Sequence, residues 1–187
     1  MTHDEDYFRY LLQRSRIGSW YRRFWLYPKL TRFLRGSVLD VGCGIGDFLA
    51  FRPGSVGVDI NSYAIDWCVR RGLDARLMRG DGLPVEDAVF QSVILDNVLE
   101  HIEKPQKLLK EIRRVLQSNG SLLVGVPGKL GYDHDPDHKI YYDKNALVST
   151  LGFAGFKLET TFWTPFHSAW LESHMRQYCL YGVFTLG

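Results

Sequence analysis

Three glycines at alternate positions form the strongest chemical signal in the sequence. Gly42, Gly44 and Gly46 follow a short apolar run that predicts a strand over 37–42. Glycine lets the backbone turn tightly and lets a ligand approach the main chain closely. Because doubly wound sheets bind their ligands at the carboxyl ends of the strands, this loop predicts a nucleotide-type site there.

Two carboxylates beside this loop favour a cationic ligand. Asp40 precedes the glycines and Asp47 follows them, and both would repel a pyrophosphate. A dinucleotide site uses GxGxxG, and its third glycine would stand where Asp47 is. The pair would suit a sulfonium that also carries an amino group. A NAD(P)-dependent oxidoreductase on a similar sheet is the first alternative, although no Tyr-x-x-x-Lys pair follows a catalytic serine at the expected place.

A further acid closes the next predicted strand. Asp59 ends the apolar segment 55–60 and lies 19 residues after Asp40. At the tip of a neighbouring strand, a carboxylate can accept hydrogen bonds from both hydroxyls of a ribose. The plainer interpretation is that Asp59 only caps the following turn. We favour the ribose role because GVDI repeats the strand-then-acid arrangement of the first motif.

Taken in order, these segments resemble the class I S-adenosylmethionine-dependent methyltransferases over about residues 36–163. VLDVGCGIG is similar to the first motif of that family and GVDI to the second. GDGLP at 80–84 resembles the segment after strand three, and SVILDNVLEHI at 92–102 resembles the strand-four motif. The resemblance implies S-adenosylmethionine as the cofactor. It also implies a seven-stranded, mostly parallel sheet whose seventh strand is antiparallel.

The same resemblance implies which residues hold the cofactor. They are Asp40, Gly42, Cys43, Gly44, Gly46, Asp59, Ile60, Asp81, Gly82, Asn97 and Val98. Asp81 takes the position of the acid that bonds the adenine amine, while Asn97 and Val98 fall at the end of strand four. Cys43 is most simply a small residue within the glycine loop.

Two histidines are the candidates for acid–base catalysis. Methyl transfer is an in-line displacement with an already activated leaving group, so positioning supplies much of the rate and a base serves only some acceptors. His101 lies on the turn after strand four, and His138 lies in the loop YDHDPDHKIYY at 132–142, with His134 as a weaker choice. The plainer interpretations are a histidine bonded to backbone and a solvated polar loop.

Two patterns raise the question of a metal ion. His134 and His138 stand among three aspartates, which are ligand types for a divalent ion, but Pro136 disturbs the helix that such spacing needs. Some ubiquinone-pathway O-methyltransferases use Glu-x-x-Glu-His, and here Asn97 replaces the first acid. The sequence therefore predicts no metal site.

The predicted methyl acceptor is a small or lipid-linked molecule. Asp96-Asn97-Val98-Leu99 is not the Asn/Asp-Pro-Pro-Tyr/Phe motif of amino-DNA methyltransferases. None of the cysteines takes the place of a pyrimidine C5 nucleophile, and no added RNA-binding domain is present. Nucleic acid is therefore disfavoured as a partner. A non-catalytic module that only binds S-adenosylmethionine is the second alternative function.

The elements that must position these residues alternate between strand and helix. Further strands are predicted over 75–81, 92–97, 121–127, 156–163 and 178–186. Helices are predicted over 4–15, 19–34, 62–71, 105–116 and 143–151. This order predicts an α/β, doubly wound, Rossmann-like sheet with helices on both faces and an N-terminal helical lid. The two closing strands predict an antiparallel hairpin at one edge.

Length and composition predict a single globular domain over 1–187. The chain has 187 residues, 45% of them hydrophobic, and a net charge of +2. We expect 36–187 to be the cofactor-binding core and 1–35 to be a helical extension. Three cysteines without CxxC spacing, and an acidic start unlike a signal peptide, predict a reducing, cytoplasmic location. No apolar stretch is long enough to span a membrane.

The segment 16–35 is basic and aromatic, with six Arg or Lys and no Asp or Glu. One interpretation is a lid whose aromatic residues wall an apolar acceptor pocket. Another is peripheral attachment to an anionic membrane surface. Stacking on nucleic acid is disfavoured because the segment is short and the total charge is low. The plainest interpretation is that the aromatics pack on the sheet and the arginines are solvated. The sequence does not indicate an oligomeric state.

Overall fold

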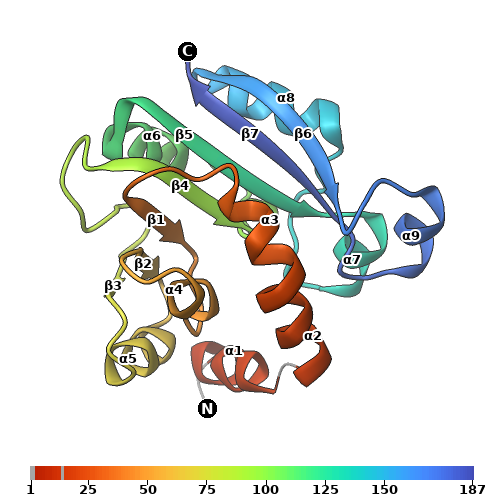
Figure 1. Ribbon diagram of the computed structural model, residues 1–187, viewed down its shortest axis with the longest axis horizontal. Helices are drawn as coiled ribbons and strands as arrows, with labels where there is room; N and C mark the ends of the chain where they lie inside the picture. The colour runs from red at the N-terminus through yellow and green to blue at the C-terminus, as the bar shows by residue number, and fades with distance from the viewer. Residues whose placement is uncertain (1–2, 14) are drawn as a thin grey trace.

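Seven strands form one sheet in the order β3-β2-β1-β4-β5-β7-β6 in this computed structural model, which describes residues 3–13 and 15–187 (Figure 1). The strands are β1 (Val38–Val41), β2 (Val56–Asp59), β3 (Ala75–Leu77), β4 (Phe90–Asp96), β5 (Leu116–Pro127), β6 (Phe156–Thr164) and β7 (Cys179–Leu186). β3, β2, β1, β4 and β5 pair in parallel, and β7 lies antiparallel between β5 and β6. The predicted mostly parallel sheet with an antiparallel seventh strand is confirmed.

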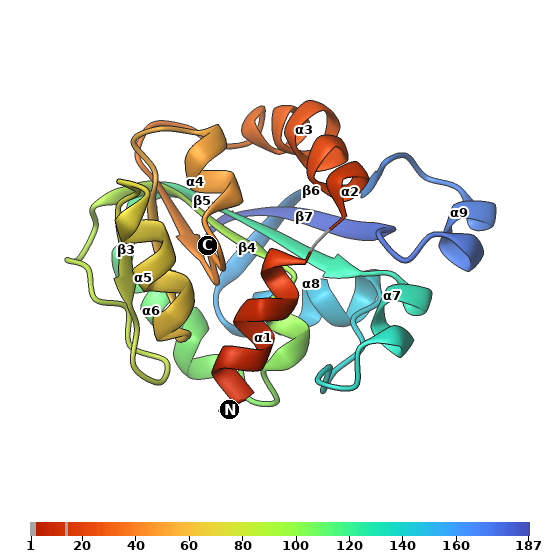
Figure 2. The same cartoon turned by 90° about the horizontal axis from the view of Figure 1, so that it is seen from below.

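Helices cover both faces of this sheet, as predicted. They are α1 (His3–Leu12), α2 (Arg16–Tyr21), α3 (Tyr27–Thr31), α4 (Asp47–Phe51), α5 (Ser62–Arg70), α6 (Gln106–Val115), α7 (Lys129–His134), α8 (Lys144–Phe153) and α9 (Ala169–His174). Figure 2 shows α3 and α4 on one side of the sheet and α6 and α8 on the other. α1 lies in front of the strand ends.

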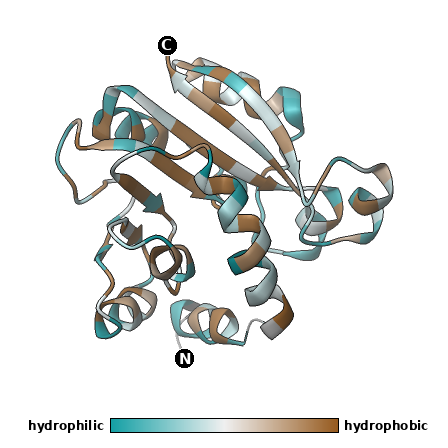
Figure 3. Cartoon of the chain, in the orientation of Figure 1, coloured by the Kyte–Doolittle hydropathy of each residue, from teal (hydrophilic) through white to brown (hydrophobic). Residues whose placement is uncertain are grey.

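Two apolar layers hold the helices to the sheet. On one face, Leu108 and Ile112 of α6 and Leu147 of α8 pack against Leu39 of β1 and Val93 of β4. On the other face, the α3 residues Tyr27 and Leu30 pack with Phe48 of α4, Ile94 of β4 and Tyr181 of β7. Figure 3 shows the hydrophobic residues gathered on the inner strands. Burial on both faces explains why these strands read as continuous apolar runs.

The helix predicted over 19–34 is divided into three parts. α2 leads into a π-helical segment, η1 (Arg22–Leu26), which continues into α3. Pro28 lies in the first turn of α3, has no N–H and cannot bond the carbonyl four residues earlier. A widened π turn accommodates this without ending the helical path. Residues 1–2 and 14, which belong to the predicted extension 1–35, lie outside the described residues.

Several predicted boundaries are wrong. β3 ends at Leu77 rather than at 81, because Gly80 adopts a left-handed φ of 58° and Arg79 pairs with Gly82 in a turn. β5 starts at Leu116, directly after α6, and not at 121 as predicted, because Asn119-Gly120 lies in an irregular part of the strand. The short helices α4, α7 and α9 were not predicted, since each has only five or six residues. In the described part of the chain, no helix has the length and apolarity needed to cross a bilayer.

Candidate active site at the carboxyl edge of the sheet

The glycine loop and the end of β4 are in direct contact. Gly42 has a left-handed φ of 80°, and a Cβ placed there would lie 2.3 Å from Cγ2 of Val98. The backbone amides of Gly42 and Cys43 both donate to the Val58 carbonyl of β2, at 2.8 and 3.1 Å. Glycine at position 42 therefore lets three parallel strands bring their ends together. The structure brings Gly42 and Val98, two of the predicted cofactor residues, into contact.

The Asp59 carboxylate ties the end of β2 to this loop. Its Oδ2 accepts a hydrogen bond from the Gly44 amide and its Oδ1 accepts one from the Asn61 amide, both at 2.8 Å. The side chain is buried, and burial raises the pKa of Asp59 although the backbone hydrogen bonds oppose the shift. Asp59 thus holds the glycine loop in shape, in addition to any contact with a ligand.

Carboxylates accumulate at this edge of the sheet. Burial raises the pKa of Asp40 well above its usual range, and the nearby Asp96 and Asp59 raise it further. None of the interactions that shift Asp40 comes from an Arg, Lys or His side chain. A positively charged ligand would relieve this repulsion, which is what the sequence predicted for a sulfonium.

Asn97, directly after β4, has a strained backbone. Its φ is 55°, a left-handed value that is uncommon for a residue with a side chain, and the side chain is exposed. The Asn97 amide donates to the Gly125 carbonyl of β5 at 2.9 Å, and its Nδ2 donates to Asp96 Oδ1 at 2.9 Å. Strain maintained by such bonds is typical of functional sites. The left-handed turn moves Asn97 and Val98 out of the sheet at its carboxyl edge.

Helix α1 covers the glycine loop. Leu11 is 1% exposed, and its Cδ1 would be 3.4 Å from a Cβ at Gly44. The Asn61 Nδ2 donates to the Asp4 carbonyl at 2.7 Å, and Phe8 stacks on Tyr63 of α5 at a ring distance of 6.3 Å. Of the N-terminal helices, α1 therefore lies over the loop, while α3 packs on the sheet face.

Comparison with known proteins agrees with this geometry. The family described as "Methyltransferase domain" matches residues 39–124, from β1 into β5. An uncharacterized protein of Methanocaldococcus jannaschii is 29% identical, with 68% of this chain and 69% of that protein aligned. A Mycobacterium tuberculosis protein named "Probable S-adenosylmethionine-dependent methyltransferase" is 29% identical over 73% of this chain and 55% of its own length. The chain thus spans little more than half of the mycobacterial relative.

A solved structure has the same fold over its whole length. A S-adenosylmethionine-dependent methyltransferase of Thermotoga maritima superposes with a TM-score of 0.78 at 16% identity, covering 100% of both chains. The chain carries a class I S-adenosylmethionine-dependent methyltransferase domain. The residues of this methyltransferase fit its cofactor, because the carboxylates around Asp40 need a cation and the glycine loop offers close approach. S-adenosylmethionine, when bound, supplies the sulfonium methyl group.

The remaining predicted cofactor residues of the methyltransferase have different surroundings. Gly46 caps α4 with a φ of 76°, and a Cβ there would overlap Leu73 and Cys68. Cys43 is buried against Gly57, so only its backbone can face a ligand. Ile60, 66% exposed beside Asp59, leaves an apolar side chain free to cover a ring. Asp81 and Gly82 lie in the loop beyond β3, and their contact with an adenine stays a prediction.

The two candidate catalytic histidines of the methyltransferase lie side by side. The rings of His101 and His138 are 4.6 Å apart, although 37 positions separate them in the sequence. The Glu100 carbonyl accepts hydrogen bonds from the amides of Lys139 and Ile140, at 2.7 and 3.1 Å. These bonds anchor the loop that carries His138 beside the 3₁₀ turn η2 (Leu99–His101).

Glu100 is the site residue that sequence reasoning missed. Its side chain is 1% exposed, and neither carboxylate oxygen has a hydrogen-bond partner in the described structure. Burial, with smaller contributions from Asp96 and Asp135, raises the pKa of Glu100 to about 8. The sequence showed Glu100 next to His101, but its burial depends on the packing of η2. His134, by contrast, is exposed and pairs with Arg176 at 2.7 Å, outside this cluster.

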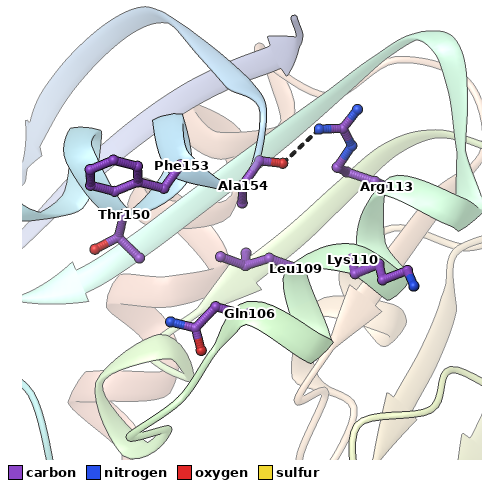
Figure 4. A pocket seen from close by; sticks show the side chains of 7 residues that line it. All are labelled: Gln106, Leu109, Lys110, Arg113, Thr150, Phe153 and Ala154. Carbon is purple, nitrogen blue, oxygen red and sulfur yellow. Dashed lines mark hydrogen bonds between the residues drawn. The ribbon is translucent and has the colours of Figure 1, made fainter.

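A separate cavity lies between α6 and α8, away from every predicted site residue. Its volume is about 480 Å³ and its lining residues are Gln106, Leu109, Lys110, Arg113, Thr150, Phe153 and Ala154. Figure 4 shows Arg113 bonded to the Ala154 carbonyl, at 2.7 Å, beside this cavity. The cavity lies between two covering helices, and the charged residues among its lining, Lys110 and Arg113, are both cations, with no acid or histidine among the described residues that line it. It contributes nothing to the methyltransferase site.

Proposed function

We propose that this enzyme transfers the methyl group of S-adenosylmethionine to a lipid-linked acceptor at an anionic membrane surface inside the cell. The observation that carries this proposal is an exposed aromatic face on the N-terminal helices. We define the aromatic face as Trp20, Phe24 and Trp25, together with the aliphatic Ile17; these four side chains are 66%, 57%, 52% and 82% exposed. Large apolar side chains gathered at a surface in this way mark an interaction site.

The charge around the aromatic face selects the partner. The segment 16–35 contains six Arg or Lys and no acid. Tryptophan and phenylalanine at a bilayer interface, with arginines toward anionic headgroups, form the usual pattern of interfacial helices. Trp20 and Phe24 lie one helical turn apart with ring centroids 5.1 Å apart, so they can enter the interface together.

The lid position of α1 connects this surface to the chemistry. α1 covers the glycine loop and is followed along the chain by α2, the start of the aromatic face. Docking of α2 on a bilayer would therefore place the site near the acceptor. There the acceptor atom attacks the methyl carbon, the carbon–sulfur bond breaks with its electron pair returning to sulfur, and S-adenosylhomocysteine is left. For a hydroxyl acceptor, the cluster of Glu100, His101 and His138 handles the proton.

Vesicle sedimentation tests the membrane proposal. Phosphatidylcholine vesicles are compared with vesicles that also contain phosphatidylglycerol, using the wild type and the double variant Trp20→Ser/Phe24→Ser. Phe153→Ser on α8 is the matched control, because Phe153 is 93% exposed but lies outside the basic segment. We expect salt-sensitive binding to the anionic vesicles that only the double variant loses. Absence of wild-type binding, or equal loss in the control, points to a soluble small-molecule acceptor instead.

Calorimetry with S-adenosylhomocysteine tests the cofactor site independently of the membrane. Asp59→Asn removes one carboxylate oxygen from the loop and should weaken binding by about 10–100-fold, or roughly 1.4–2.8 kcal/mol. Asp66→Asn on the exposed side of α5 is the control and should bind normally. Equal affinities in the two variants would remove Asp59 from the site.

A further inference from the structure

We infer that Glu100, His101 and His138 form a site for one divalent transition-metal ion. A ligand atom from each of the three side chains lies within 4.8 Å of the other two. The 3.8 Å between Glu100 Oε1 and His138 Nε2 is too long for a hydrogen bond. It is close to the roughly 3.4 Å that separates two ligands of one tetrahedral ion with bonds of about 2.1 Å.

The tautomer of His138 leaves Nε2, the ring nitrogen that faces Glu100, free to bind a metal ion. Its Nδ1 lies 2.9 Å from the Tyr132 carbonyl, which can only accept, so Nδ1 carries the proton and Nε2 carries the lone pair. Nε2 faces Glu100 Oε1 at 3.8 Å and Asp135 Oδ2 at 3.9 Å. A histidine with one nitrogen fixed by a carbonyl and the other free is the usual arrangement of a metal ligand.

The surroundings of the other two residues also favour a cation. Both oxygens of Glu100 are buried without a partner, which is costly for a carboxylate unless a positive charge is close. Asp96 and Asp135 add negative charge around Glu100, and no Arg, Lys or His is among the groups that shift it. His101 is hydrogen-bonded to the backbone of Asp137, so its ring is also fixed.

The ligand types indicate which ion. Two imidazoles with one carboxylate suit Zn²⁺ or Fe²⁺ and disfavour Mg²⁺ and Ca²⁺, which prefer oxygen ligands. Three protein ligands leave an open position for an acceptor oxygen, as in catalytic metal sites. This proposal departs from the sequence expectation of no metal. In the sequence pattern Asn97 stands where the first acid of the motif would be, whereas in the fold His138 comes from a separate loop to join Glu100 and His101. When the ion is bound, the two histidines are its ligands; the proton transfer given above for a hydroxyl acceptor refers to the cluster without the ion.

Zinc binding to the full chain tests the assignment. Zn²⁺ buffered by nitrilotriacetate is titrated into wild type, Glu100→Gln, His138→Gln and the control His134→Gln. We expect one ion per chain in the wild type and the control. The other two variants should lose about 100-fold or more, because a ligand contributes more than the roughly 10–100-fold of a second-shell residue. Glu100→Gln should fold well, since it removes an unpartnered buried carboxylate.

Co²⁺ absorption identifies the ligands, because Cys43, Cys68 and Cys179 are free thiols that could also bind zinc. We expect the visible d–d absorption bands of bound Co²⁺ and no thiolate-to-cobalt charge-transfer band. Absence of wild-type binding, a thiolate band, or binding that persists in Glu100→Gln would overturn the site. The metal readout needs neither cofactor nor acceptor. If the protein binds S-adenosylhomocysteine normally but does not bind zinc, only the metal site is rejected. If it binds zinc but not S-adenosylhomocysteine, only the proposed function is rejected.

Discussion

Tyr181 on β7 reaches across β5 and donates a hydrogen bond of 2.6 Å to Oδ1 of Asp96 at the end of β4. Gly125 of β5 makes room for this bond, since a Cβ there would lie 2.4 Å from the Tyr181 ring and 2.7 Å from Asp96 Oδ1. Burial, together with Asp96, raises the pKa of Tyr181 well above its usual value, so its hydroxyl stays a donor. The bond fixes the carboxylate that precedes the strained Asn97.

Tyr181→Phe should lower the free energy of unfolding by about 1.5–3 kcal/mol, because it removes one of the hydrogen bonds to a charged acceptor. Urea denaturation measures the loss. Tyr178→Phe is the control: this residue is also buried, and its hydroxyl accepts a hydrogen bond of 3.1 Å from the neutral Ser168 amide. A loss in Tyr181→Phe no larger than in the control would show that the Asp96 bond adds no stability.

Gly42→Ala should be destabilised more than Gly54→Ala. Both glycines have left-handed φ values, 80° and 86°. A Cβ at Gly54 meets nothing within 4 Å, so its change costs only the backbone strain of about 1–2 kcal/mol. A Cβ at Gly42 also overlaps Val98. Thermal unfolding compares the two, and adding Val98→Ala should recover part of the loss in Gly42→Ala but none in Gly54→Ala.

Leu11→Ala should loosen α1 from the glycine loop. Leu11 is 1% exposed and the neighbouring Leu12 is 41% exposed, so Leu12→Ala is a matched control. Removing a buried leucine costs about 2–5 kcal/mol in a core, and a peripheral helix responds by local opening. We expect faster hydrogen exchange in α1 and faster S-adenosylhomocysteine dissociation only in Leu11→Ala. Equal dissociation rates in the two variants would mean that α1 does not retain the cofactor.

The preference for S-adenosylmethionine over S-adenosylhomocysteine should increase with pH. Only the former is a sulfonium cation, and burial with neighbouring acids raises the pKa of Asp40. As the pH rises through the raised pKa values of Asp40 and Asp59, the site gains negative charge and favours the cation. Titration calorimetry between about pH 5 and pH 8 gives both affinities.

The stability of the unliganded fold should change in the opposite direction. A carboxyl group whose folded pKa is raised binds protons more tightly in the native state, so unfolding becomes easier as pH rises through that window. Asp40→Asn should therefore stabilise the free protein at neutral pH and flatten the pH dependence of cofactor preference. A preference that stays constant across the range in the wild type would contradict the electrostatic role of Asp40.

Local patterns in the sequence were enough to predict that the proposed cofactor residues lie at one edge of the sheet. The positions of Gly42, Asp40 and Asp59 follow from strands that end in glycine or acid, and parallel strands bring their carboxyl ends to one edge. The seven-stranded, mostly parallel sheet and its antiparallel seventh strand followed from the family resemblance. Because these features depend on residues close in sequence and on a common topology, they can be predicted from the sequence without the tertiary structure.

Only the tertiary structure showed which residues form the second part of the candidate site, the cluster around Glu100. Glu100, His101 and His138 come together because the loop after α7 bonds to the Glu100 carbonyl, a contact between segments almost forty residues apart. Burial of Glu100, the meeting of Tyr181 with Asp96 and the placement of Leu11 over Gly44 likewise depend on side-chain packing across elements. Periodicity and motif spacing describe one element at a time, and so they cannot show which side chains from distant segments become buried against one another.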